Sequence, residues 1–116
     1  MRRAVILAVV LVFGARAAIA DTPPNTLSEA ERRSGWRLVF DGRSTAGFRS
    51  YRRPDVADGW VVEDGALVRR GATAGDLVTA AEFGSFELQL EYRISPGGNS
   101  GLMFHVTEDA EHPWQS

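Results

Sequence analysis

Residues 86–94 carry the clearest periodicity in the chain. Apolar and polar side chains alternate over nine residues, FELQLEYRI. Because a β-strand sends successive side chains to opposite faces, one face of this segment would be apolar and the other polar. Turn-forming residues follow at 95–101, and the alternation resumes at 102–106. The pattern predicts two long strands, paired as antiparallel neighbours and joined by a glycine-rich loop.

The first twenty residues have the composition of a secretory signal peptide. Met1-Arg2-Arg3 is a short basic stretch, residues 4–13 are unbrokenly apolar, and Ala18-Ile19-Ala20 forms a cleavage motif before Asp21. The apolar run is about half of the ~20 residues that span a bilayer, which favours a cleaved leader over a membrane anchor. We therefore expect cleavage after Ala20 and a periplasmic or secreted product.

The charge balance argues against a polyanionic partner. Without residues 1–20, the chain keeps 10 arginines against 15 acidic residues, a formal net charge of −5. Such a surface gives no electrostatic reason to bind nucleic acid or an anionic membrane. The sequence has no cysteine, which excludes disulfides, thiolate metal sites and a cysteine nucleophile.

The segment 21–34 is expected to be a lead-in followed by a short helix. Thr26 and Glu29 have the spacing of a capping box, which would make Thr26 the N-cap of a helix that runs to Arg33 and is closed by Gly35.

From Gly35 on, short strands and turns are predicted. Strands are expected at 36–40, 60–62, 66–68 and 76–79. Asp64-Gly65 between two of them is a strong hairpin signal. The spacing of the strands is typical of an antiparallel β-sandwich.

Several blocks of this sequence resemble one carbohydrate-active family. The blocks are GWRLVFDGRS, GWVVEDGALV, GDLVT, FGSFELQLEYRISPGGNSGLMFHV and PWQS. Their order and spacing are similar to those of the 3-keto-disaccharide hydrolase domain, also described as a 3-keto-glucoside lyase and 3-keto-hydroxyglucal hydratase domain. The resemblance implies an all-β, concanavalin-like jelly roll at residues 35–116 that acts on carbohydrate.

The resemblance also implies a longer domain. Such sandwiches commonly run to ~200 residues, so we expect this chain to be the N-terminal part of one. Its long apolar strand pair would then lack a covering layer, and residues 21–116 alone are expected to be aggregation-prone.

The implied chemistry needs acid–base groups. In a sugar oxidised at C3 the hydrogen on C2 is acidic, and its removal allows the C1 substituent to leave. His105 is the candidate base or acid, because histidine changes protonation near neutral pH, and Glu91 is its candidate carboxylate counterpart. The candidate substrate-binding residues are Glu87, Arg93, Asn99 and Asp76. A divalent metal could stabilise the enolate, although no metal-ligand spacing is evident.

Each of these residues also has a purely structural interpretation. The charged side chains of a strand can simply form a solvated face. Glu91 and Arg93 can form an ordinary ion pair, and Asn99 can be a turn residue. Trp60 and Trp114 could stack on sugar rings, but a tryptophan in an apolar strand more often lies in the core.

The sequence leaves other functions open. Glu87-Leu-Gln-Leu-Glu91 resembles the E-x-D-x-E strand of endoglucanases, with Gln89 in place of the central aspartate. Its two glutamates have Cα atoms ~13 Å apart along a strand, which is too far for a retaining pair unless the side chains lean inward. The sequence is also compatible with a lectin-like module that binds glycans without turnover, and with an inactive fragment.

Overall fold

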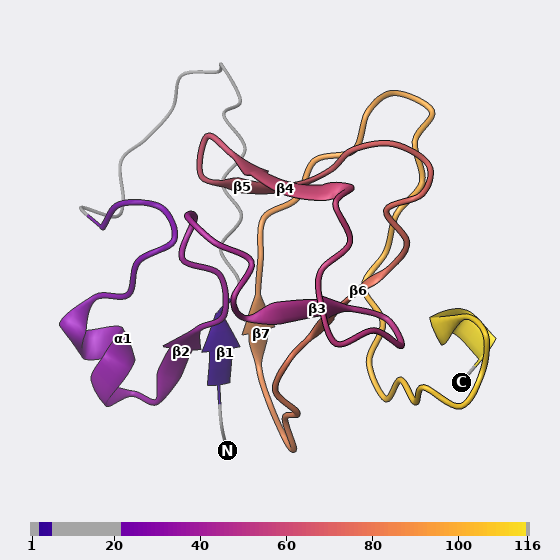
Figure 1. The fold of residues 1–116 in the computed structure, drawn as a ribbon. Coiled ribbons are helices and arrows are strands. Elements are labelled where there is room, and N and C mark those ends of the chain that lie inside the picture. Colours follow the sequence, from indigo (N-terminus) through magenta and orange to yellow (C-terminus); the bar gives the residue numbers. More distant parts are fainter. Residues whose placement is uncertain (1–2, 6–21, 116) are drawn as a thin grey trace.

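The computed structural model describes residues 3–5 and 22–115. Strands carry most of the regular structure and form three small sheets, so the all-β prediction is confirmed. The sheet orders are β2-β1-β7, β3-β6 and β4-β5 (Figure 1). A jelly roll closed by two large sheets stays a prediction. Within the described ranges, no helix is long and apolar enough to cross a membrane.

The helix α1 (Glu29–Arg33) starts later than the sequence predicts. Its N-cap is Ser28, whose hydroxyl accepts from the backbone N–H of Glu31 while the Glu31 carboxylate accepts from the backbone N–H of Ser28. The capping box is therefore Ser28 with Glu31, and the assignment to Thr26 and Glu29 was wrong. The predicted end is correct, because Gly35 follows the helix with φ +90°, a left-handed conformation that glycine adopts at little cost.

The predicted hairpin is confirmed. β4 (Trp60–Glu63) pairs antiparallel with β5 (Ala66–Arg69), with Glu63 opposite Ala66. The two turn residues, Asp64 and Gly65, have φ values of 49° and 74°. Positive φ at both central positions defines the turn type whose twist matches that of the strands, and Asp-Gly is the pair that it favours.

The strand β3 (Phe48–Ser50) was not predicted from the sequence. It pairs antiparallel with β6 (Leu77–Thr79), which falls inside the predicted strand 76–79. The two strands start 29 residues apart in the chain, so no local turn signal marks the pairing.

The core is small and lies under β3 and the chain that precedes it. Phe40 is completely buried and packs edge-to-face against Phe48, with ring centroids 6.5 Å apart. Ser50 is buried, and its hydroxyl accepts from the backbone N–H of Ala57 at 2.8 Å. The other buried apolar side chains are Leu27, Ala57 and Ala74.

The predicted lead-in is held by a buried asparagine. Asn25 is 4% exposed and has φ 54°, and its Nδ2 donates to the carbonyl oxygen of Gly65 at 2.7 Å. Its Oδ1 is buried without a hydrogen-bond partner. A Cβ on Gly42 would come within 2.7 Å of the same amide. Asn25 therefore ties the lead-in to the Asp64-Gly65 turn by a hydrogen bond and packs closely against Gly42.

The three-stranded sheet includes part of the predicted signal peptide. β1 (Arg3–Val5) lies between β2 (Trp36–Leu38) and β7 (Leu88–Gln89) and is parallel to both. The predicted strand 36–40 is thus found in shortened form. The cleavage motif lies outside the described residues, so cleavage stays a prediction.

The expected long strand pair is not formed. Within 86–106 only β7 is a strand, and its partner is β1 rather than residues 102–106. Every residue from 91 to 105 is exposed. The expected turn does form, because the backbone N–H of Gly98 donates to the carbonyl oxygen of Ser95 at 2.8 Å. Alternation defines an apolar face, but pairing also needs a layer that buries this face.

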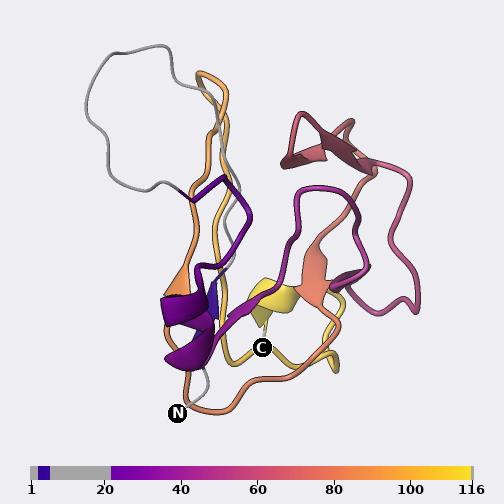
Figure 2. The same cartoon turned by 90° about the vertical axis from the view of Figure 1, so that its left-hand side faces the viewer.

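The last described element is η1 (Pro113–Gln115), a single 3₁₀ turn. In Figure 1, α1 lies at the lower left, the β4–β5 hairpin at the top and η1 at the lower right, and α1 and the hairpin are again well separated in Figure 2.

Candidate functional site

His105 stands out among the candidate residues because of its backbone. It has φ +59°, a conformation that is uncommon for residues other than glycine and that clusters at functional sites. Its ring meets that of Phe104 edge-to-face, with centroids 5.1 Å apart. Both side chains are exposed, so surrounding structure does not fill the space beside the imidazole.

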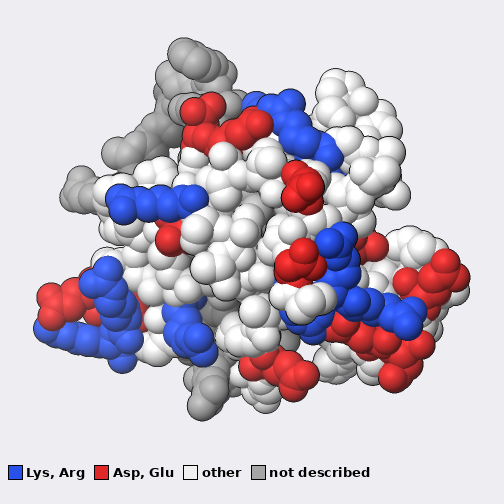
Figure 3. All heavy atoms as spheres, in the orientation of Figure 1, with Lys and Arg blue, Asp and Glu red and all other residues white. Residues whose placement is uncertain are grey.

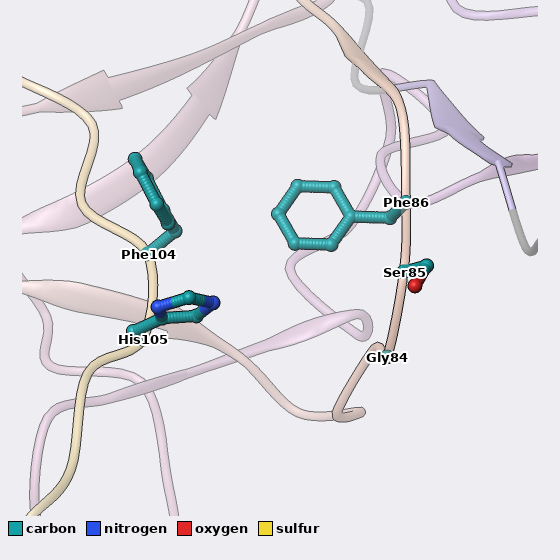
Figure 4. A pocket seen from close by; sticks show the side chains of 5 residues that line it. All are labelled: Gly84, Ser85, Phe86, Phe104 and His105. Carbon is teal, nitrogen blue, oxygen red and sulfur yellow. The ribbon is translucent and has the colours of Figure 1, made fainter.

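A pocket opens between His105 and a segment far away in the sequence. It has a volume of about 360 Å³ and is lined by Gly84, Ser85, Phe86, Phe104 and His105. Phe86 and His105 point toward one another from the two sides (Figure 4). The space is open to solvent rather than enclosed, because all five lining residues are exposed. The aromatic rings offer flat apolar surfaces, and the imidazole offers a proton donor or acceptor beside them.

The other sequence-predicted site residues do not line this pocket. Four of them are exposed, namely Glu87, Glu91, Arg93 and Asn99. Asp76 is half-buried, and its carbonyl oxygen accepts from the backbone N–H of Tyr51 at 2.9 Å. The structure thus places His105 beside Phe86 and Phe104 rather than in a polar row with Glu91. The predicted roles of these residues remain predictions.

A charged clamp that the sequence did not reveal holds the chain just after His105. The Arg49 guanidinium binds both carboxylate oxygens of Glu108, with Nη1 3.0 Å from Oε2. The backbone N–H of Arg52 donates to Glu108 Oε2 at 2.7 Å. Tyr51 Oη lies 3.0 Å and 2.9 Å from the carbonyl oxygens of Thr107 and Ala110. Residues 107–110 are therefore fixed against the end of β3, only two residues beyond His105.

The clamp shifts the pKa values of its two partners apart. The hydrogen bond from Arg49 lowers the pKa of Glu108 below its ordinary value of 4.5, and the N–H of Arg52 adds to this, while burial opposes it. The pKa of Arg49 is raised by the same hydrogen bond. Both groups therefore remain charged at neutral pH. Figure 3 shows acidic and basic groups side by side over much of the face it presents.

No sequence signal could have found this clamp. Arg49 and Glu108 are separated by 59 positions, and neither lies in a motif. Only the pairing of β3 with β6 and the course of the chain after His105 bring the two together.

The donor set for a divalent metal is not assembled in the described part of the chain. No three histidine, aspartate or glutamate side chains among residues 3–5 and 22–115 lie so as to hold an ion. We therefore derive no step through a metal.

Comparison with known proteins defines the class of domain. Residues 35–116 match the family described as the 3-keto-alpha-glucoside-1,2-lyase-like domain. This match covers most of the chain and nearly all of the described strands. The chain therefore belongs to that family.

One curated relative can be compared directly. The chain is 35% identical over 82 residues to a 3-keto-disaccharide hydrolase of Bacteroides thetaiotaomicron. The alignment covers 64% of this chain and 28% of the relative, so the chain spans under a third of that protein's length. No solved structure matches the chain.

Proposed function

We propose that the protein is an exported carbohydrate-active enzyme that cleaves 3-keto-glycosides. The family match over residues 35–116 carries the proposal, and the name of the Bacteroides relative supports the substrate class. The pocket beside His105 adds a site of suitable size with a group able to move a proton.

The proposed reaction begins with removal of a proton from C2. The 3-keto group makes this hydrogen acidic, because the electron pair left on C2 is delocalised onto the C3 oxygen as an enolate. Collapse of the enolate forms a C1–C2 double bond and breaks the bond from C1 to the glycosidic oxygen. That oxygen takes a proton from an acid as it leaves. Addition of water across the double bond, with OH at C1 and H at C2, completes a net hydrolysis.

His105 is the group that we assign to proton transfer at C2. It lines the pocket, and the clamp holds the residues that directly follow it. Phe86 and Phe104 would pack against the ring and keep water from part of it. The roles proposed for Glu91, as the acid for the leaving oxygen, and for Arg93 or Asn99, as the partner of the enolate, rest on the sequence alone, because none of the three lines this pocket.

The experiment is a turnover assay with the full chain on a 3-keto-glucoside and on its unoxidised parent. We expect release of the aglycone from the 3-keto sugar only. His105→Ala and Glu91→Gln should each lower kcat by on the order of 10²–10⁴ if they transfer protons. Two matched exposed neighbours serve as controls, Met103→Ala and Glu82→Gln, and both should keep the wild-type rate.

Two results would contradict this proposal. Equal turnover by wild type, His105→Ala and Glu91→Gln would remove the assigned roles. Binding of both sugars with no product from either would favour a lectin-like module.

A further inference from the structure

The C-terminal turn carries an aromatic stack that the proposed reaction does not use. The rings of His112 and Trp114 lie face to face, with centroids 4.3 Å apart and planes 8° from parallel. Trp114 is nevertheless 62% exposed. A large aromatic side chain held flat at the surface, with one face covered and most of its area still in water, has the form of a binding platform.

The turn that holds the stack is built to be rigid. Pro113 is buried and anchors η1. The backbone N–H of Gln115 donates to the carbonyl oxygen of His112 at 3.1 Å, and the backbone N–H of His112 donates to Gln115 Oε1 at 2.9 Å. Because the indole is already fixed, a ligand that packs on it would lose little entropy in ordering the side chain.

The chain that leads into the turn is also fixed. Arg49 and Arg52 hold Glu108 and Ala110, so the segment 108–110 that leads into the turn is anchored to β3 and the residues after it. The carboxylate of Glu111 lies 4.0 Å from Nε2 of His112, at the edge of the stack, and is 82% exposed. The platform therefore combines an apolar face with an acceptor for hydroxyl groups beside it.

We propose that the outer face of Trp114 is a sugar-binding subsite, with Glu111 accepting hydrogen bonds from the hydroxyls of the bound ring. A pyranose ring has one face formed by C–H bonds, whose partial positive charge suits the negative face of an indole, and it has hydroxyls around its rim. This inference rests on the proposed carbohydrate function and assigns it a second contact, outside the pocket of His105.

The test is a binding measurement with the full chain, separate from turnover. Methyl glucoside and its 3-keto derivative are titrated, and saturation transfer from aromatic protons of the protein to sugar C–H protons is recorded by NMR. Trp114→Ala should weaken binding by roughly 3- to 10-fold and abolish most of the transfer, whereas Trp114→Phe should retain it. Tyr92, 76% exposed but outside the stack, provides the matched control, and Tyr92→Ala should bind as the wild type does.

The outcomes separate this inference from the proposed reaction. Weaker binding by Trp114→Ala without turnover of the 3-keto sugar would support the subsite and overturn the reaction. Normal turnover with unchanged binding by Trp114→Ala would overturn the subsite and leave the reaction standing. A change in the sedimentation of Trp114→Ala with no change in sugar binding would identify the platform as a protein contact and also overturn the subsite. Trp114→Phe keeps the test valid if the alanine variant misfolds.

Discussion

The β4–β5 hairpin and residues 91–105 both place apolar side chains on either side of a turn, yet only the first forms a sheet. In the hairpin, two turn residues bring the strands together and fix their register, with Val61 opposite Val68. Residues 91–105 have a turn at Ser95 to Gly98, but the chain on either side of it stays exposed and forms no strand. The difference shows that a turn specifies a partner locally, whereas a long amphipathic segment needs a second layer to bury its apolar face.

The largest expected effect is the difference in unfolding free energy between removing a buried and an exposed phenylalanine side chain. Phe40 is fully buried, so Phe40→Ala should lower the free energy of unfolding by about 3–5 kcal/mol through lost burial and the cavity left behind. Phe104 is 67% exposed, and Phe104→Ala should change it by no more than about 0.5 kcal/mol. Urea denaturation of both variants measures the two values.

The same two variants can also show that residues 91–105 are not exposed in solution. A loss of several kcal/mol on Phe104→Ala would mean that residues 91–105 are packed in solution. In that event the segment would be a buried strand, as the alternation predicts.

The sequence predicted the locally determined parts of the fold well. The Asp64-Gly65 turn, both strands beside it, β6 and the glycine that ends α1 follow from short-range chemistry. β3 was missed because its partner lies far along the chain. The N-cap of α1 was placed two residues early because Thr26 and Ser28 each have a glutamate three positions on, and only the backbone shows which pair closes the box.

The site was predictable only in part. His105 was found because histidine changes protonation near neutral pH and because the predicted strand pair placed it on the polar face with Glu91. Its neighbours in the pocket were missed, since Gly84, Ser85 and Phe86 carry no catalytic signal and meet His105 only through the course of the chain. The clamp on Glu108 was missed for the same reason.

A smaller effect is expected from two glycines, one in each of the compared regions. Gly65 has φ +74°, so Gly65→Ala should destabilise the hairpin by about 1–2 kcal/mol, the cost of a left-handed conformation for a residue with a Cβ. A Cβ on Gly101 would meet nothing within 4 Å, and its φ lies outside the left-handed region. Gly101→Ala should therefore be neutral or slightly stabilising. Thermal unfolding followed by circular dichroism gives the melting temperatures of the two variants. Equal shifts in melting temperature for Gly65→Ala and Gly101→Ala would show that the turn does not control the stability of the hairpin.

The smallest effect is a pH dependence at the clamp. Because the folded pKa of Glu108 lies below its ordinary value of 4.5, the carboxylate stabilises the fold above that pH, and this stability is lost as the pH falls through the folded pKa. The wild-type melting temperature should therefore fall on acidification by more than that of Glu108→Gln. The pKa values of Asp41 and Glu63 are also lowered, and both groups are retained in the variant. Parallel pH profiles for the two proteins would show that Glu108 contributes nothing.

If residues 1–20 are the proposed leader, the position of β1 would place folding and export in kinetic competition. Arg3–Val5 supplies the strand that joins β2 to β7, and these residues belong to the proposed leader. A chain that completes this sheet before translocation has its leader already bound into the fold and out of reach of a translocase. A chain whose leader is removed first keeps β2 and β7 without the strand between them, and that place is then open to a different one. Under the proposed export, the order of folding and cleavage would therefore decide which strand occupies the centre of this sheet.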